Sequence, residues 1–594
     1  MNIRTDILWR VYLVYAIVAM CALAVVWQLC KIQLLEGHKW KAMADSLSIR
    51  YTNIAANRGN IYSDDGSLLA TSLPEYELRL DAEVLSHNPD LLNAKIDSLS
   101  KCLATLFHEH SSSQYKHLLQ TACRKNERYF LLGNKVSYPQ LMQVKTFPIF
   151  NLGRYKSGLI AIQLNKRIKP FGNLAQRTIG YYTQTVQPVG LEGAYRNYLQ
   201  GKDGKQLVEL VAGGVWLPLH DEAELSPVDG NDIISTINVN IQDVAQNSLF
   251  HYMNLHNAEH GCVIVMEVAS GEIKAIANLT RTSPGCYEEK YNYAIGEAAE
   301  PGSTFKLATY MVALDDHKLD TNTLVNVHGG TITLFNHQIR DAERGDQMLT
   351  VKQAFEKSSN VAAATLINNA YLNDPSRFTT GLMKLDLNKR LGLQIPGEAW
   401  PRIKTPSSAD WSKLSLPQMA YGYEVALTPL QMLTLYNGVA NNGKMIAPLF
   451  VKEIDHLGKP LKQFEGRIIN PSMCKESTLR KIRKMLEGVV LEGTAKSMQN
   501  KLYTIAGKTG TAQIAQGKAG YNVGGVKYQA SFCGYFPAEH PRYSMIIVMN
   551  DPTGGQYYAA EVAGPVFLDI ANKIYSSQLD MHDAYAVVTQ KQYK

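Results

Sequence analysis

The chain has 594 residues, too many for one hydrophobic core, so at least two domains are expected. Hydrophobic residues make up 45% and charged residues 19% of the sequence, which excludes a disordered chain and a transporter with many membrane spans. The net charge of +7 is modest and spread along the chain. It weakly favours an anionic neighbour such as a membrane surface. Because no basic stripe or recognition motif is present, nucleic acid is not expected as a partner.

The N-terminal segment is apolar. Residues 11–29 carry no charge, and Gln28 is their only strongly polar side chain. At about 1.5 Å per residue, such a helix crosses a hydrocarbon core of about 30 Å. A cleaved signal peptide is the alternative, but the segment is long for one and lacks a small-x-small cleavage site. We expect a short cytoplasmic tail at 1–10 and a single transmembrane helix at 11–30. The flanking charges do not fix its orientation, and no second span follows.

Eight cysteines are few for this length, and they form no CxxC pair and no metal-ligand spacing. Cys102 and Cys123 flank a predicted helical hairpin. A disulfide between them and two partly buried free thiols are equally compatible with the sequence.

Residues 31–230 alternate short strands and helices with frequent turns and show no catalytic pattern, as expected for a scaffold. Residues 58–62, followed by the turn Asp64-Asp65-Gly66, predict a strand and a return strand. Residues 92–119 predict helices that are interrupted by three serines.

A second compositional unit spans residues 231–580, followed by a C-terminal tail at 581–594. It begins with a strand, a helix and a strand hairpin, is mainly helical over residues 299–498, and ends with further strands and a closing helix. The later elements are expected at residues 503–506, 530–535, 544–549 and 562–575. This order predicts an antiparallel sheet with helices packed on it, and therefore a multidomain α+β protein.

Several familiar motifs are incomplete. Gly507-Lys508-Thr509 lacks the first glycine of a phosphate-binding loop, and His108-Glu109-His110 lacks the second histidine of a zinc-protease helix. The Gly-x-Ser-x-Gly turn of α/β-hydrolases is not present in the sequence.

The first element that favours catalysis is Ser303-x-x-Lys306, which follows Glu300-Pro301-Gly302 and leads into an apolar helix. Three positions apart on a helix, the two side chains share a face. Burial disfavours an ammonium group, so Lys306 would be a plausible base for the Ser303 hydroxyl. The alternative is an N-capping serine followed by a surface lysine.

The second element is Lys357-Ser358-Ser359-Asn360, between two predicted helices. A tight interhelical loop would point Ser358 and Asn360 into a cleft. Alternatively, Asn360 simply caps the second helix.

The third element, residues 506–512, follows a strand pattern and contains Lys508, Thr509, Gly510 and Thr511. Small residues on an edge strand let a substrate backbone approach and pair with it. The lysine and the two hydroxyls would suit a peptide carboxylate. An ordinary glycine turn is the alternative.

Together the three elements resemble the Ser-x-x-Lys, Ser-Asp-Asn and Lys-Thr-Gly set of penicillin-binding proteins and class A β-lactamases. The middle element departs from this form because Ser359 stands where the aspartate is expected. Arg58-Gly59-Asn60-Ile61 and Gly190-Leu191-Glu192-Gly193 resemble the pedestal of class B penicillin-binding proteins. No glycosyltransferase-like region precedes them, unlike in class A enzymes.

The resemblance implies a single transmembrane helix, an elongated pedestal domain at 31–230 and a transpeptidase domain of serine β-lactamase-like fold at 231–580. It implies that Ser303 attacks the penultimate D-Ala carbonyl of a stem peptide and that Lys306 takes its proton. Ser358, Asn360 and Lys508 would move protons and hold the substrate. Thr509 and Thr511 would bind its carboxylate, Gly510 would also lie in the substrate-binding site, and backbone N–H groups of Ser303 and Thr511 would form the oxyanion hole. No cofactor or metal is implied.

The form of the motifs, including Tyr421-Gly422-Tyr423, looks most like the division-specific FtsI type. The implied partners are peptidoglycan stem peptides and their lipid-linked precursor, β-lactams as inhibitors, and an FtsW-type glycan polymerase with other division proteins. The implied location is the cytoplasmic (inner) membrane, with the catalytic domain in the periplasm. An elongation-type enzyme, a carboxypeptidase, a β-lactamase, a β-lactam sensor and an inactive structural member of the division complex are the alternatives.

Overall fold

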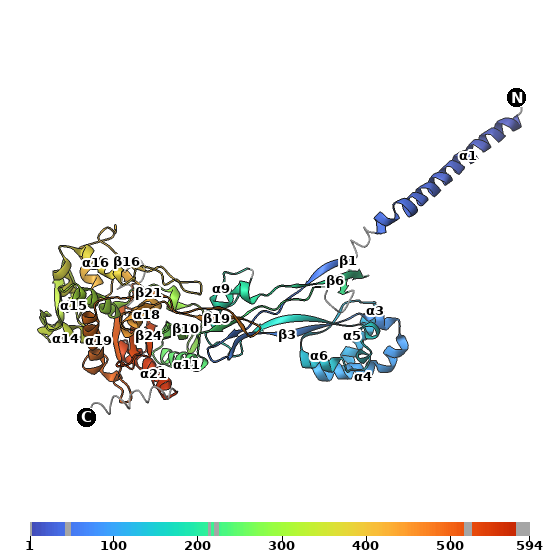
Figure 1. The fold of residues 1–594 in the computed structure, drawn as a ribbon. Coiled ribbons are helices and arrows are strands. Elements are labelled where there is room, and N and C mark those ends of the chain that lie inside the picture. The colour runs from blue at the N-terminus through green and yellow to red at the C-terminus, as the bar shows by residue number, and fades with distance from the viewer. Residues whose placement is uncertain are drawn as a thin grey trace. The chain divides into compact units, whose positions relative to one another are not determined.

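The computed structural model describes residues 3–41, 49–183, 185–211, 215–218, 225–515 and 526–577 (Figure 1). The chain divides into two compact units that are not consecutive in sequence. The first unit comprises Met1–Asn57, Ser72–Arg167 and Gly201–Asp229, and the second comprises Arg58–Thr71, Ile168–Gln200 and Gly230–Lys594. The tail expected at 581–594 lies outside the described residues.

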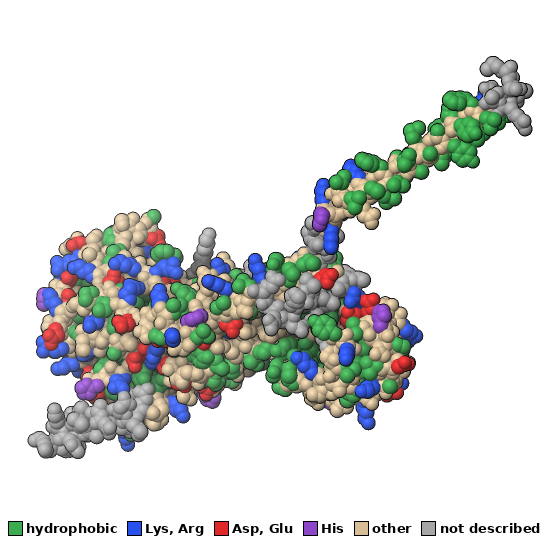
Figure 2. Space-filling view, turned by 45° about the vertical axis from the view of Figure 1, so that its right-hand side comes forward, with side chains coloured by type: hydrophobic (Ala, Val, Ile, Leu, Met, Phe, Trp, Pro, Cys, Tyr) green, Lys and Arg blue, Asp and Glu red, His purple; other side chains and the backbone are tan. Residues whose placement is uncertain are grey.

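The first unit begins with helix α1 (Ile3–Cys30), which continues into a π-helical turn, η1 (Lys31–Leu35). Within the described residues, one segment, Ile7–Leu35, is long and apolar enough to cross a membrane, and none of its most apolar stretch is buried. Figure 2 shows hydrophobic side chains along the length of α1. A helix that is apolar all round and packs against no protein core has the character of a membrane span.

The rest of the first unit contains a small antiparallel sheet of order β1-β6-β7 and a helical hairpin beside the long strand β3, which pairs with β4 and β5. Its strands are β1 (Ile49–Ile54), β4 (Phe130–Ser137), β6 (Gly204–Val211), β7 (Val215–Pro218) and most of β3 (Leu68–Leu80) and β5 (Leu159–Ile168), since Leu68–Thr71 and Ile168 fall in the second unit. Its helices are α3 (Ala82–Ser86), α4 (Pro89–Phe107), α5 (Ser112–Arg124), α6 (Tyr138–Val144), η2 (Phe150–Leu152) and α7 (Arg154–Ser157).

The hairpin of α4 and α5 confirms the interrupted helix predicted over residues 92–119. Ser111 begins α5 with a capping box: its hydroxyl accepts a hydrogen bond from the Gln114 N–H, and the Gln114 side chain accepts one from the Ser111 N–H. The serines therefore mark a helix start. Cys102 and Cys123 are both free thiols. Burial raises the pKa of the Cys123 thiol.

The core of the second unit is a six-stranded antiparallel sheet of order β11-β10-β9-β24-β23-β22, as predicted. Every residue of β24 is buried, so both faces of the sheet are covered. Helices α11 and α21 pack against each other and against the sheet, and α18 packs on β23 and β24. Strand β22 is at one edge of this sheet.

The strands of the second unit are β2 (Ile61–Tyr62), β8 (Asp232–Ser235), β9 (His260–Glu267), β10 (Ile273–Ser283), β11 (Cys286–Glu288), β12 (Leu324–Asn326), β13 (Thr331–Leu334), β14 (His337–Arg340), β15 (Met348–Thr350), β16 (Arg402–Ile403), β17 (Val425–Ala426), β18 (Met445–Ile446), β19 (Val451–His456), β20 (Lys459–Gln463), β21 (Ile468–Asn470), β22 (Ala506–Gln513), β23 (Tyr528–Phe536) and β24 (Tyr543–Asn550).

Its helices are α8 (Gln176–Ile179), α9 (Gly190–Ala194), α10 (Arg196–Leu199), α11 (Val239–Leu255), α12 (Tyr293–Gly296), η3 (Gly302–Phe305), α13 (Lys306–Asp315), η4 (His328–Gly330), α14 (Val351–Glu356), α15 (Asn360–Tyr371), α16 (Pro375–Lys384), α17 (Ser415–Met419), α18 (Pro429–Ala440), α19 (Glu476–Leu491), η5 (Lys496–Met498), α20 (Ala559–Val562) and α21 (Gly564–Ser577).

Helices are the main regular elements of region 299–498, as expected, and short antiparallel pairs such as β13–β14 and β18–β21 separate them. One expectation needs correction. The strand expected at 503–506 begins at Ala506 and continues to Gln513, through the Lys-Thr-Gly element. Small and polar residues there hide the usual strand pattern, but the main chain pairs with β23 along its whole length.

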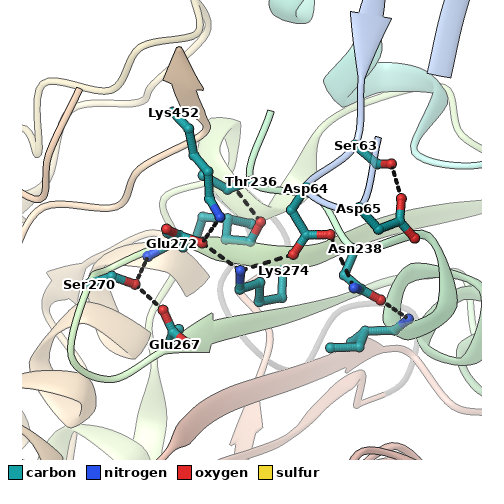
Figure 3. A network of polar contacts seen from close by, with 12 residues as sticks. Ser63, Asp64, Asp65, Thr236, Asn238, Glu267, Ser270, Glu272, Lys274 and Lys452 are labelled. Atoms are coloured by element: carbon teal, nitrogen blue, oxygen red, sulfur yellow. Dashed lines mark hydrogen bonds and ion pairs between the residues drawn. The ribbon is translucent and has the colours of Figure 1, made fainter. Parts of the chain in front are cut away.

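A buried charge network lies within the second unit (Figure 3). Lys274 Nζ of β10 lies 3.0 Å from Asp64 Oδ2 and also binds Glu272, and Lys452 Nζ lies 3.1 Å from Glu272 Oε2. Asn238 Nδ2 donates to Asp64 Oδ1 at 3.1 Å. Burial alone would lower the pKa of Lys274, but the hydrogen bonds to the two carboxylates outweigh it and raise that pKa. The network ties the turn after β2 to the start of β10 and to β19, which belongs to another sheet.

Candidate active site

Ser303 lies in the 3₁₀ turn η3, directly before α13. We expected the first turn of an α-helix, so the serine lies one tighter turn earlier. Gly302 has φ +58°, and a Cβ at this position would meet Ala512 Cβ at 2.6 Å. A side chain there would be strained and would clash with β22, so glycine lets the serine turn approach the strand.

Lys306 begins α13, and its side chain is 0% exposed, so it is not a surface lysine. Its Nζ lies 2.5 Å from Ser358 O, 2.8 Å from Asn360 Oδ1 and 3.2 Å from Ser358 Oγ. The first and second sequence elements therefore meet at this amine. Within the described residues, Ser303 Oγ forms no hydrogen bond with Lys306 Nζ.

Burial lowers the pKa of Lys306 to about 7, and the nearby charge of Asp341 opposes this shift. A neutral amine has two N–H donors and one lone pair. Ser358 O and Asn360 Oδ1 can only accept, so they take the two N–H groups. The Ser358 hydroxyl is then the group that donates to the lone pair. The neutral form thus links Ser358 and Lys306 in a path along which a proton can move.

Ser358 lies on the turn between α14 and α15, as the sequence predicts, and Asn360 is the first residue of α15. Ser359, rather than Asn360, caps α15: its Oγ accepts from the Ala362 N–H at 2.9 Å. The amide of Asn360 is held on both sides, because its Nδ2 donates to Arg340 O at 3.1 Å. This leaves Oδ1 facing Lys306.

The third element occupies the edge strand β22, where Lys508 is 0% exposed. Lys508 Nζ donates to Thr509 O at 3.1 Å. A Cβ on Gly510 would meet Thr304 Cγ2 at 3.0 Å, so β22 packs directly against the Ser303 turn. Thr511 Oγ1 accepts from the Ala559 N–H at 3.2 Å, which leaves its own proton free to donate.

The two buried lysines affect each other. Burial lowers the pKa of Lys508 well below its ordinary range, and the charge of Lys306 lowers it further. Because two adjacent buried ammonium groups are costly, the site disfavours a doubly charged state.

The structure brings together Lys306, Ser358 and Asn360 by hydrogen bonds, and β22 and the Ser303 turn by packing. Thr509 is engaged elsewhere, because its Oγ1 lies 2.6 Å from Thr494 Oγ1. Within the described residues, no group of three or more His, Cys, Asp or Glu side chains is placed to hold a metal ion.

Sequence reasoning missed Asp341, which follows β14. Its Oδ1 accepts from the N–H groups of Asn360 and Val361 at 2.6 and 2.9 Å, and its Oδ2 accepts from Ser359 Oγ at 2.7 Å. The one signal in the sequence was the missing aspartate of the second element, at position 359.

Solved structures share this fold. Penicillin Binding Protein 2X from Streptococcus thermophilus superimposes with a TM-score of 0.77 over 90% of this chain and 81% of that one, at 20% sequence identity. Within this shared fold, the three sequence elements bring together a serine turn, a buried lysine and an edge strand.

Two models of known protein families match the sequence of this chain. The penicillin binding protein transpeptidase domain matches residues 261–572, and the penicillin-binding protein dimerisation domain matches residues 53–235. The chain belongs to the penicillin-binding protein transpeptidase family. It is 26% identical to "Peptidoglycan D,D-transpeptidase FtsI" of Buchnera aphidicola, over 95% of this chain and 94% of that protein. It is 27% identical to "Probable peptidoglycan D,D-transpeptidase PbpC" of Pseudomonas aeruginosa, over 95% and 94%.

Proposed function

We propose that the chain is a peptidoglycan D,D-transpeptidase that cross-links stem peptides through an acyl-enzyme on Ser303. The observation that carries the proposal is the buried amine of Lys306, which is held against Ser358 and Asn360 one turn after Ser303. An amine with a pKa near 7 can accept a proton at neutral pH, as a base for a serine hydroxyl must.

In the acylation step, Ser303 Oγ bonds to the carbonyl carbon of the penultimate D-Ala, and its proton passes to Lys306 Nζ. Backbone N–H groups of Ser303 and Thr511 stabilise the oxyanion. The bond to the terminal D-Ala nitrogen then breaks, and that nitrogen takes up the proton from Lys306 by way of Ser358, so that free D-Ala leaves. In the second step, an amine of a neighbouring stem attacks the ester, its proton returns to Ser303 Oγ, and the new amide is released.

Substrate binding uses the outer side of β22, the edge strand of the sheet among the described residues. An extended stem peptide can add as a further strand there, which requires the small residues that β22 contains. Thr511 donates its hydroxyl proton to the terminal carboxylate, and Lys508 supplies positive potential when protonated. Thr509 and Gly510 complete the backbone that faces the peptide.

The relatives named FtsI support a role in septal cell-wall synthesis. We place the chain as a single-pass protein of the cytoplasmic membrane, anchored by the helix within Ile7–Leu35. Because peptidoglycan lies outside that membrane, the domain at 231–580 faces the periplasm and the pedestal spans 31–230. An FtsW-type glycan polymerase is the proposed partner. The exposed apolar surface of α1 supports a contact within the membrane.

The test is intact-mass spectrometry of the full chain in detergent after incubation with a penicillin. The expected result is one stable adduct on the wild type, retained in Ser407→Ala, an exposed serine, and lost in Ser303→Ala. Rapid drug turnover without an adduct would indicate a β-lactamase instead. If the wild type shows no adduct and no drug turnover, the enzymatic proposal is contradicted and a structural role remains.

A further inference from the structure

Asp341 lies outside the three sequence elements but contacts the second one at three points. It follows β14 and reaches the turn between α14 and α15. Its two carboxylate oxygens accept from Asn360 N, Val361 N and Ser359 Oγ, at distances between 2.6 and 2.9 Å. Within the described ranges it pairs with no lysine or arginine, so its charge is met by these donors.

Two of these donors are the first N–H groups of α15, which have no acceptor within the helix. A carboxylate at this end also interacts favourably with the helix dipole. Ser359 supplies the acceptor for the third N–H, of Ala362, and donates its own proton to Asp341. Asp341 and Ser359 therefore share the capping of α15.

The consequence for the site lies in the backbone of Ser358. This residue has φ +57°, in the left-handed region of the backbone that residues other than glycine rarely adopt. The conformation turns both Ser358 O and Ser358 Oγ toward Lys306 Nζ. It persists only if the residues that follow it are held, and Asp341 holds Ser359, Asn360 and Val361.

We propose that Asp341 is a positioning residue for the proposed transpeptidase: it fixes the Ser358–Asn360 turn against Lys306 and sets the negative charge that this lysine experiences. In the Ser-Asp-Asn form of the second sequence element, an aspartate stands at the position of Ser359. Here Asp341, directly after β14, supplies a carboxylate next to that position. The inference rests on the proposed function, because it concerns the rate and pH dependence of acylation.

The effect of Asp341 on the charge of Lys306 involves few titratable groups. Asp341, after β14, acts on Lys306 and on Tyr310 of α13, and Lys306 acts on Lys508 of β22. Burial raises the pKa of Tyr310, so it stays neutral. Asp341 raises the pKa of Lys306 against the effect of burial. Removal of this charge should therefore move the acidic limb of the acylation rate to lower pH.

Asp341→Asn tests both parts, because the amide has nearly the same shape and keeps one acceptor oxygen. The rate of penicillin acylation of the full chain in detergent is followed by intact mass as a function of pH. We expect a plateau rate about 10- to 100-fold lower than in the wild type, the loss typical of a misplaced catalytic group. We also expect the acidic limb at lower pH. Asp346→Asn, an exposed aspartate paired with Lys357 at 2.7 Å, is the matched control and should behave as wild type.

Ser359→Ala distinguishes the positioning of the Ser358–Asn360 turn from the effect of the negative charge of Asp341. It removes one contact of Asp341 and one cap of α15 but leaves the carboxylate in place, so the rate should fall while the acidic limb stays at its wild-type pH. If Asp341→Asn fails to fold, as judged by its thermal transition, Ser359→Ala decides alone, and a wild-type rate would overturn the proposal. A wild-type rate and limb in a folded Asp341→Asn would also overturn it while leaving the transpeptidase intact. No acylation of the wild type would overturn the proposed function and this inference with it.

Discussion

Lys306 Nζ and Asn360 Oδ1 lie 2.8 Å apart, although 54 positions separate the two residues in the sequence. The amide oxygen can only accept, and Asn360 Nδ2 is occupied by Arg340 O, so the contact fixes one N–H of the amine. Ser358 O fixes another. When Lys306 is neutral, its remaining lone pair is directed at a hydroxyl. These contacts accommodate the neutral amine that a base needs, and burial is what lowers the pKa of Lys306.

This relationship predicts how acylation depends on pH. Because burial lowers the pKa of Lys306 to about 7, the amine is protonated below that pH and cannot accept the Ser303 proton. The rate of penicillin acylation should therefore rise as pH increases through about 7 and level off above it. Acylation reactions are stopped at successive times at pH values between 5 and 9. The fraction of acylated protein, measured by intact mass, gives the rate at each pH. A flat profile over that range would contradict the role of Lys306.

Lys306→Met should lower the acylation rate by about 10²- to 10⁴-fold, the usual contribution of a general base. Methionine fills a similar volume and suits a buried position, so the fold should be retained. Lys318→Met, at an exposed position three residues after the end of α13, is the control and should acylate at the wild-type rate. Equal rates in both variants would show that another group takes the serine proton.

Thr511→Val removes a hydroxyl and keeps the shape of the side chain. The Thr511 hydroxyl accepts from Ala559 N–H and has its proton left to donate. If it binds the carboxylate of substrate and drug, acylation should fall by about 10- to 100-fold, as for a hydrogen bond to a charged group. The loss should be smaller for an ester or amide of the penicillin carboxylate, measured in parallel. Thr282→Val, at an exposed position of β10, is the control. A wild-type rate in Thr511→Val would exclude it from carboxylate binding.

Much of this site could be predicted from local sequence. Ser303 and Lys306 are three residues apart, and an apolar run after them indicates burial, which the structure confirms for Lys306. The helices on either side of Ser358 follow from their own patterns. Such predictions succeed because helix periodicity and capping depend on neighbours along the chain.

Other features depend on contacts that no local pattern contains. Asp341 reaches Asn360 from another element, and the assignment of Arg58–Thr71 and Ile168–Gln200 to the second unit depends on packing. The extent of β22 was also hidden, because pairing with β23 forms this strand where its own residues show no strand alternation.

The charge network in Figure 3 predicts a stability effect. Lys274 is 7% exposed and binds both Asp64 and Glu272. Lys274→Met would leave these two largely buried carboxylates with fewer partners; losing one partner of a fully buried pair typically costs about 3–5 kcal/mol, which is the upper bound here. The apparent thermal midpoint of the full chain should fall by several degrees. Lys290→Met breaks an exposed pair with Glu288 at 3.7 Å, where at most about 1 kcal/mol is expected. Equal midpoints for the two variants would mean that the network does not stabilise the fold.

Glu289 predicts a dependence of stability on pH that is separate from catalysis. Its carboxyl is 7% exposed and accepts from the N–H groups of Arg177 and Asn278 at 2.7 and 2.9 Å. Burial outweighs these hydrogen bonds and raises its pKa from the ordinary 4.5 to about 7. Between these values the folded chain binds a proton that the unfolded chain releases, so stability falls as pH rises through this window. The full effect is about 3 kcal/mol, since one pKa unit corresponds to about 1.4 kcal/mol.

Glu289→Gln cannot ionise and should remove that slope, whatever it does to the absolute stability. The measurement is the apparent thermal midpoint of wild type and variant at a series of pH values from 5 to 8, at one heating rate. Glu288→Gln is the matched control, because this adjacent carboxylate is 59% exposed and forms an ion pair with the exposed Lys290. It should keep the wild-type slope. If wild type and Glu289→Gln lose stability in parallel as pH rises, Glu289 is ionised throughout and its surroundings stabilise the carboxylate more than burial penalises it.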